Sequence, residues 1–165
     1  RYFSDFPAVV KNVAQSVPIG TEVYVKEHPN MFGIRSGSYY DELRKLPNVR
    51  VLSPSVSSRD LVRNATASVC ITSSVGLESV INGTPAITLA NPNYSMLESV
   101  QRIDGYDELP DTIVDCSSRG VDTSDVAAYV SACLDVGIPR DHSSFPKRVC
   151  ELIERAQKRQ SEEIS

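Results

Sequence analysis

Three short segments of the chain carry the side chains that could do chemistry. The segment 26–35 contains a histidine between cationic residues, the segment 72–78 contains hydroxyls and a carboxylate, and the segment 90–94 contains amides and a tyrosine. Cations and hydroxyls bind anions, whereas carboxylates and amides accept hydrogen bonds from sugar hydroxyls. The set therefore suits an anionic ligand that carries a sugar. The residues assigned to this ligand are Lys26, His28, Pro29, Arg35, Thr72, Ser73, Ser74, Gly76, Glu78, Asn93 and Tyr94.

Each of these segments follows a stretch with the pattern of a β-strand. Strands are predicted over residues 21–26, 48–52, 68–72 and 86–89, from their β-branched and apolar runs. Apolar residues at helical spacing predict helices over 5–16, 39–46, 58–64, 73–82, 122–136 and 144–158. Residues 95–102 also fit a helix, and residues 113–114 fit a short extended segment.

Strands that alternate with helices indicate an α/β fold. The prediction is a Rossmann-like parallel sheet with helices on both faces, built as a single domain over residues 1–165. Ligands of such sheets bind beyond the carboxyl ends of the strands. The three segments lie at those ends, so we expect them to meet at one edge of the sheet.

The segment that starts at Thr72 is a strand-to-helix turn. Ser73 and Ser74 would place hydroxyls and backbone N–H groups at the positive end of a helix, which suits a phosphate. Gly76 would allow close approach of the backbone, and Glu78 could accept hydrogen bonds from a ribose. A structural interpretation stays open for each: a serine that caps the helix, a small residue under a strand, and a carboxylate that favours the helix dipole.

His28 is one of two histidines in the chain, the other being His142. At a strand end it could donate a hydrogen bond to a phosphate oxygen, but a lone histidine is more often structural. Lys26 and Arg35 could add positive charge there, or could be solvated charges at the end of a strand and in a loop.

Several classes of function are disfavoured by composition. A net charge of −4 argues against nucleic-acid binding through phosphates. The four cysteines lack metal-ligand spacing, no P-loop or dinucleotide fingerprint is present, and no metal or cofactor is expected. Cys70 lies in an apolar run and is interpreted as a small buried residue. The acidic residues between Asp104 and Asp111 are interpreted as a solvated loop.

Two motifs carry a resemblance to a known family. His28-Pro29 resembles the His-Pro motif of transferases that use CMP-sugars, and Ser73-Ser74 resembles the serine or threonine motif that holds the same phosphate. A third pattern starts at Glu78 and continues, after four residues, with Gly83-Thr84-Pro85. It is similar to a wider GT-B pattern, in which the glutamate often binds the ribose. Over residues 20–115 the chain resembles the carboxy-terminal half of GT-B glycosyltransferases, and most closely the bacterial capsule and surface polysaccharide synthesis proteins.

The resemblance implies a donor-binding domain of a glycosyltransferase. Its substrate would be a nucleotide sugar, with CMP-Kdo as one candidate, and its acceptor would be a surface or capsular glycan. The acceptor would bind to an amino-terminal half outside this chain, which starts at Arg1 without a methionine. We therefore name no catalytic residue and expect the chain alone to be inactive. Thr72-Ser73-Ser74 departs from the Thr-Gly-Thr of many capsule-type relatives, which leaves the donor open.

Two other classes of function stay open. A nucleotide-sugar epimerase could share the glutamate-to-glycine pattern, although it should carry a larger acid/base set. A non-catalytic nucleotide-binding or interaction module could keep the same fold. No run approaches about 18 consecutive apolar residues, so no membrane helix is expected. With no secretory leader at its start and no disulfide framework expected from its four cysteines, we expect a cytoplasmic protein, with peripheral association at the inner face of the membrane as an option.

Overall fold

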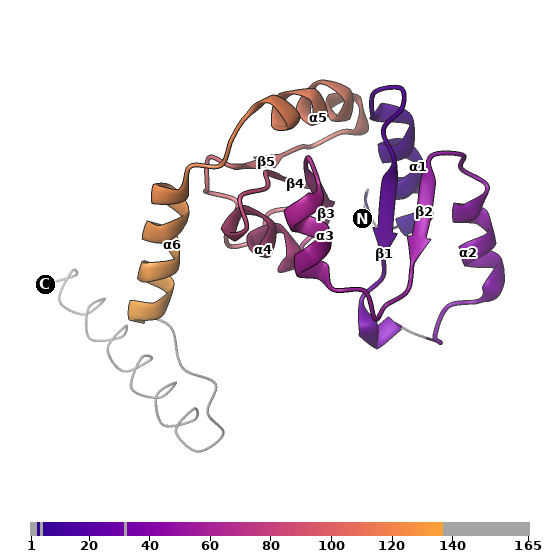
Figure 1. Ribbon diagram of the computed structural model, residues 1–165, viewed down its shortest axis with the longest axis horizontal. Coiled ribbons are helices and arrows are strands. Elements are labelled where there is room, and N and C mark those ends of the chain that lie inside the picture. Colours follow the sequence, from indigo (N-terminus) through magenta and orange to yellow (C-terminus); the bar gives the residue numbers. More distant parts are fainter. Residues whose placement is uncertain (1–2, 4, 32, 137–165) are drawn as a thin grey trace, which may run out of the picture. The chain divides into compact units, whose positions relative to one another are not determined.

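The computed structural model describes residues 3, 5–31 and 33–136. Contacts divide the chain into two units, Arg1–Val126 and Ala127–Ser165. All the strands described here belong to the first unit (Figure 1). The helix predicted over 144–158 and His142 lie outside the described residues.

The strands of the first unit form two parallel ladders. Strand β1 (Val23–Lys26) pairs with β2 (Val49–Leu52), and β4 (Ala86–Thr88) lies between β3 (Ser68–Cys70) and β5 (Val100–Arg102). The predicted α/β class with parallel strands is confirmed. The single sheet is a correction, because hydrogen bonding stops between β1 and β3. Side-chain packing joins the two ladders instead, since Val23 and Val69 pack against the same apolar cluster.

The helices agree closely with the predicted ranges. Five predicted helices are confirmed, with ends that differ by up to two residues. Across the described residues, no helix has both the length and the apolar character needed to cross a bilayer. The helices are α1 (Phe6–Ser16), α2 (Gly37–Arg44), α3 (Ser58–Asn64), α4 (Val75–Ile81), α5 (Leu109–Ser118) and α6 (Thr123–Val136), with 3₁₀ turns η1 (Pro29–Met31) and η2 (Tyr106–Glu108).

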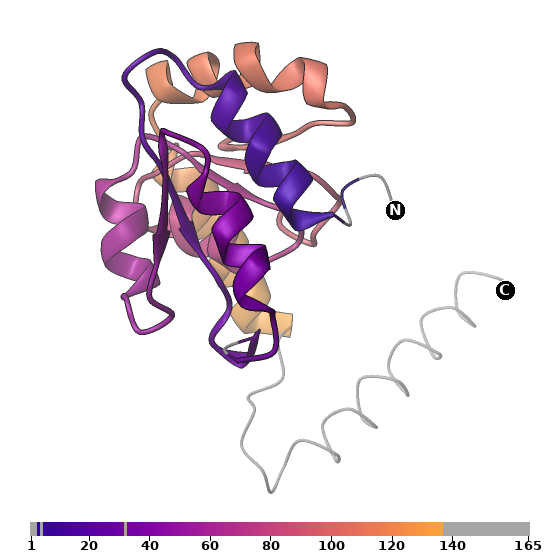
Figure 2. The ribbon, with the colours of Figure 1, turned by 90° about the vertical axis from the view of Figure 1, so that its right-hand side faces the viewer.

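Helix α1 packs on two apolar clusters at once. It starts after Asp5, whose carboxylate accepts a hydrogen bond from the Ala8 N–H, and it ends before Pro18. Val9 and Val13 pack into a cluster with β4 and α5, whereas Val10 and Ala14 pack into a cluster with β1, β2 and α2. Figure 2 shows α1 alongside α5 and α2. Helix α1 thus packs against both ladders.

Helices cover both faces of the β3–β4–β5 ladder. Ile87 is fully buried against residues of α1 and α5. Successive side chains of a strand point to opposite faces, so Ala86 and Thr88 face the other side. Helix α4 contacts β3 and β4, and an added Cβ on Gly76 of α4 would meet the Cys70 sulfur. Cys70 pairs in register with Thr88, which places α4 on that second face.

Two predictions about the last part of the ladder are wrong. Residues 113–114 are helical, not extended, because Leu109, Ile113 and Cys116 are buried at helical spacing in α5. Residues 95–102 are not a helix: a series of turns leads into β5. This strand is short and lies at the edge, with only its first residue buried, so it lacks the apolar run that reveals inner strands.

Two buried threonines before and at the end of β4 differ in their hydrogen bonding. Thr84 Oγ1 donates to the Val62 carbonyl at 2.6 Å, whereas Thr88 Oγ1 has no hydrogen-bond partner among the described residues. We expect Thr88→Val to raise the free energy of unfolding by about 1 kcal/mol, because it removes an unsatisfied buried hydroxyl. Thr84→Val should lower it by about 1 kcal/mol, because the buried hydrogen bond to the Val62 carbonyl is lost and only the Ala65 N–H still donates to that carbonyl. Urea unfolding of both variants checks this, and shifts of the same sign would contradict it.

Candidate functional site

His28 lies just beyond the carboxyl end of β1. Lys26 is the last residue of this strand and is half-buried, and His28 is exposed at the start of a turn. The Asn30 N–H donates to His28 Nδ1 at 3.1 Å. A neutral imidazole that accepts at Nδ1 carries its proton on Nε2. The exposed His28 therefore offers an Nε2–H donor, while Pro29 opens the turn η1.

Arg35 is held by its neighbours on the α2 side of β1. Its Nε donates to the Glu27 carboxylate, which also accepts from the Tyr40 hydroxyl. The guanidinium lies over the Tyr39 ring, 4.4 Å from its centroid. Burial raises the pKa of Tyr39 to about 12, and the hydrogen bond to Glu27 raises the pKa of Tyr40, so both hydroxyls keep their protons at neutral pH. This is the geometry of a loop anchor, and a role of Arg35 in ligand binding stays a prediction.

The two serines after β3 have different local roles. Ser73 Oγ accepts from the Val75 N–H at 3.3 Å and so serves the turn into α4. Ser74 is the N-cap residue, yet in the described turn its hydroxyl makes no capping hydrogen bond. Both side chains are exposed. The capping interpretation thus fits Ser73, and the Ser74 hydroxyl is available to a ligand.

A buried tyrosine forms a hydrogen bond with the backbone of this turn. Tyr94 is 2% exposed, and its hydroxyl donates to the Ser73 carbonyl, which also accepts from the Gly76 N–H at 3.2 Å. The Cys70 sulfur lies 3.5 Å from the same hydroxyl. Burial raises the pKa of the Cys70 thiol, so it stays protonated and packs as a small residue. Tyr94 therefore shapes the turn from the protein interior.

The close approach of Tyr94 depends on Gly76. A Cβ at this position would lie 2.5 Å from the Tyr94 hydroxyl and 2.9 Å from the Cys70 sulfur. Gly76 is buried in α4, where glycine is otherwise a poor helix former. The predicted role of this glycine, close approach, is met by a side chain of the protein itself.

The remaining predicted residues lie around the same strand ends. Thr72 and Asn93 are exposed, and Glu78 is half-buried in the first turn of α4. The hydrogen bond from Tyr94 to Ser73 brings the ends of β3 and β4 together, as predicted. The named contacts of Arg35 run to Glu27 and Tyr39, so they join the first segment to α2 and not to the second segment.

A groove of about 670 Å³ lies at the opposite edge of β1 and β2. The turn 17–22 lines it together with Leu46, Pro47, Asn48 and Arg50. These residues flank the amino ends of the strands, whereas the predicted site is at the carboxyl ends. The groove is therefore separate from the predicted site.

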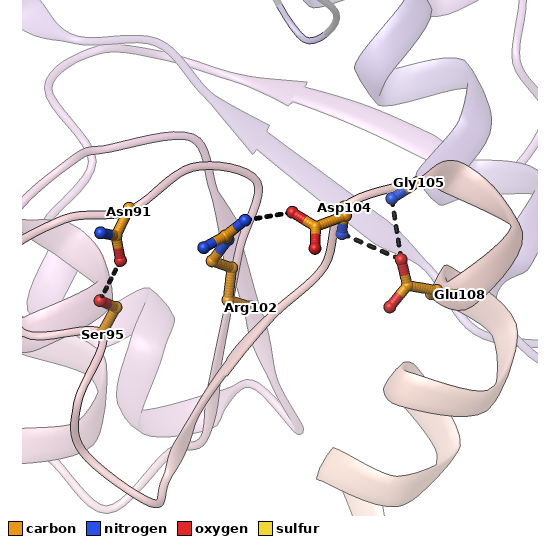
Figure 3. Close-up of polar contacts among 6 residues, drawn as sticks. All are labelled: Asn91, Ser95, Arg102, Asp104, Gly105 and Glu108. Atoms are coloured by element: carbon orange, nitrogen blue, oxygen red, sulfur yellow. Dashed lines mark hydrogen bonds and ion pairs between the residues drawn. The ribbon is translucent and has the colours of Figure 1, made fainter.

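The acidic stretch that starts at Asp104 has a structural role. Figure 3 shows the Glu108 carboxylate accepting from the N–H groups of Asp104 and Gly105, both at 2.9 Å, while Arg102 pairs with Asp104. These bonds shape the turn that leads into α5, so the solvated-loop interpretation is corrected to a helix start. Within the described part of the chain, no group of three or more His, Cys, Asp or Glu side chains could hold a metal ion.

Two residues that shape the first segment were missed in the sequence. Glu27 accepts hydrogen bonds from both Arg35 and Tyr40, although neither Glu27 nor Tyr40 matches a motif. A signal for Glu27 was present, since strand alternation places it on the same face as Val23 and Val25, toward the core. A carboxylate there needs partners. Tyr40 gave no comparable signal.

Comparisons with known proteins give a structural neighbour and a family match. A crystal structure of the glycotransferase of kitacinnamycin superposes with a TM-score of 0.47 at 17% identity, and the match covers 90% of this chain but 38% of that one. No curated protein matches the chain at a significant level. The family model described as capsule polysaccharide biosynthesis protein matches residues 2–98, which is more than half of the sequence and includes both the His28-Pro29 and the Ser73-Ser74 motifs. The chain belongs to the capsule polysaccharide biosynthesis protein family.

Proposed function

We propose that this chain is the nucleotide-sugar-binding domain of a glycosyltransferase that builds a surface or capsular glycan. The observation that carries the proposal is the arrangement at the strand ends. His28 offers an Nε2–H beyond β1, and Ser74 offers an uncommitted hydroxyl beyond β3. Membership of the capsule polysaccharide biosynthesis family supports a role in glycan assembly.

The proposed role of these residues is electrostatic. When a sugar leaves its nucleotide, negative charge develops on the departing phosphate, and donors that are already in place stabilise it. His28, Ser73 and Ser74 would supply such donors, and Lys26 would add positive charge. Glu78 would accept hydrogen bonds from the ribose. The supporting Tyr94 would keep the Ser73 turn in place.

The donor, the acceptor and the location of the reaction are properties of the whole enzyme. The donor is a nucleotide sugar, with CMP-Kdo as the first candidate, and the acceptor glycan binds to a further domain. The reaction takes place in the cytoplasm, at the inner face of the membrane where a lipid-linked glycan is available. No protein-bound metal or cofactor is proposed.

Binding of nucleotides to the 165-residue chain tests the proposal. Titration calorimetry with CMP, UDP and GDP should give heat for one of them, and CMP would support the CMP-Kdo donor. We expect His28→Ala and Ser74→Ala each to weaken this binding about tenfold or more, because a hydrogen bond to a charged group contributes about 1.5–3 kcal/mol.

A matched control separates the site from a general effect of removing a hydroxyl. Ser118 is also exposed, but it lies at the end of α5 and donates to the Asp115 carbonyl. Ser118→Ala should bind the nucleotide as the wild type does. If none of the three nucleotides binds, the proposed function fails; if one binds and both site variants bind it unchanged, the assigned residues are wrong.

A further inference from the structure

A buried carboxylate ties together the two ends of the loop that carries His28. Glu27 directly precedes His28, and its side chain is 9% exposed. Its carboxylate accepts from Arg35 Nε, eight residues further along, and from the Tyr40 hydroxyl of α2. A paired and hydrogen-bonded carboxylate can be buried, and breaking such a pair is costly. The pair therefore joins residue 27 to residue 35, eight positions further along the chain.

Aromatic rings extend this contact to two helices. The Arg35 guanidinium lies 4.4 Å from the centroid of the Tyr39 ring, and Tyr39 stacks with Phe6 of α1 at 6.5 Å. Tyr40 meets Tyr39 edge-on at 5.1 Å. We call Glu27, Arg35, Tyr39 and Tyr40 the Glu27 clamp. It connects the loop to α1 and α2.

The clamp and His28 differ in exposure, since the Glu27 side chain is 9% exposed whereas His28 is exposed. Val25 packs into the cluster with α1 and α2, and Glu27 reaches α2 in the same direction. His28 follows Glu27 beyond the end of the strand and is exposed. The named contacts of Arg35 run to Glu27 and Tyr39, not to His28.

The turn itself determines which nitrogen of His28 carries the proton. The His28 carbonyl accepts a hydrogen bond from the Met31 N–H at 2.9 Å, and His28 Nδ1 accepts one from the Asn30 N–H at 3.1 Å. The second bond forms only while Nδ1 has no proton, so this backbone shape selects the Nε2–H form. A loosened turn would lose that selection.

We propose that Glu27 is a positioning residue, which through the clamp fixes the turn at His28 and holds this side chain as an Nε2–H donor toward a phosphate oxygen of the nucleotide. The ligand in this statement rests on the proposed function. The effect on His28 does not, because it concerns the protein without ligand.

The tautomer of His28 can be measured without nucleotide. Long-range ¹H–¹⁵N NMR in mildly alkaline solution, where histidine side chains are generally neutral, distinguishes Nδ1–H from Nε2–H. The chain has two histidines, so the His28→Ala spectrum assigns the signals. We expect the Nε2–H form in the wild type and a mixture of both forms in Glu27→Ala. Unchanged signals in Glu27→Ala would overturn the proposal.

A double-mutant cycle then tests the link to binding. With the nucleotide identified by calorimetry, Glu27→Ala should lower the affinity about tenfold, because a displaced donor loses much of its contact. In the His28→Ala background the same change should cost less than about twofold, since Glu27 acts through His28. Arg35→Ala should behave in the same way. If Glu27→Ala or Arg35→Ala still lowers the affinity about tenfold in the His28→Ala background, the proposal is overturned. For Arg35→Ala, that result would indicate a direct contact between Arg35 and the ligand.

The other end of β1 offers a matched control. Glu22 has the same kinds of partner, with Arg50 at 2.9 Å and the Tyr24 hydroxyl at 2.7 Å. Glu22→Ala should change neither the tautomer nor the affinity. If Glu27→Ala does not fold by circular dichroism, Tyr40→Phe takes its place, with a smaller shift of the tautomer expected and an unchanged tautomer overturning the proposal. If no nucleotide binds the wild type while Glu27→Ala still alters the tautomer, the proposed function fails and the positioning role stands.

Discussion

Replacing Gly76 with alanine is expected to destabilise the protein by up to about 2 kcal/mol net, although alanine is the better helix former. The added Cβ would lie 2.5 Å from the Tyr94 hydroxyl and 2.9 Å from both the Cys70 sulfur and a Tyr94 ring carbon. Contacts this short force a buried tyrosine to move, and overpacking of this kind typically costs about 1–3 kcal/mol. The cost should exceed the gain in helix propensity of about 1 kcal/mol. Urea unfolding of the purified chain measures it.

Two further variants make this result specific. Gly37 is also helical, at the start of α2, and nothing lies within 4 Å of a Cβ built there, so Gly37→Ala should be neutral or slightly stabilising. Tyr94→Phe removes the hydroxyl that meets the new methyl group. It should therefore cost less in the Gly76→Ala background than in the wild type. Equal losses for Gly76→Ala and Gly37→Ala would show that the contact with Tyr94 is not the cause.

Ile87→Ala should lower the free energy of unfolding by about 2–5 kcal/mol. Ile87 is fully buried in β4, and its neighbours in the cluster come from α1 and α5. Truncation to alanine removes apolar contacts and leaves a cavity that the surrounding elements fill only in part. Since domains of this kind are stable by about 5–15 kcal/mol in total, the variant should unfold at markedly lower urea concentration.

Ile81 provides the control for this change. It has the same side chain in α4 but is 52% exposed. Ile81→Ala should shift the unfolding free energy by less than about 1 kcal/mol, because exposed positions carry small effects and alanine favours the helix. A small effect at Ile87, or an equally large one at Ile81, would mean that the apolar cluster has been assigned incorrectly.

Much of the α/β architecture was predictable because it depends on local patterns. The spacing of Val9, Val10 and Val13 identifies α1, and the apolar run around Ile87 identifies an inner strand. The strand ends follow from these elements, so the positions of His28 and Ser74 beyond β1 and β3 could be predicted as well. The family assignment followed from motifs within those segments.

The contacts that shape the predicted site were harder to predict because they join distant residues. Tyr94 is 21 residues from Ser73, and its burial reverses the expectation of a loop side chain that faces a ligand. Glu27 and Tyr40 are 13 residues apart and match no motif. Strand β5 was not predicted from the sequence, because an edge strand of three residues has too little apolar periodicity to be recognised. Pairings of this kind depend on the folded chain.

The position of α1 between two apolar clusters has a consequence for how the protein unfolds. Neighbouring residues of one helix, Val9 and Val10, belong to different clusters. If α1 detached from one ladder, apolar surface of the other ladder would also become exposed to water. That exposure costs free energy. We therefore expect the two ladders to unfold as one cooperative unit, despite the gap in hydrogen bonding between β1 and β3.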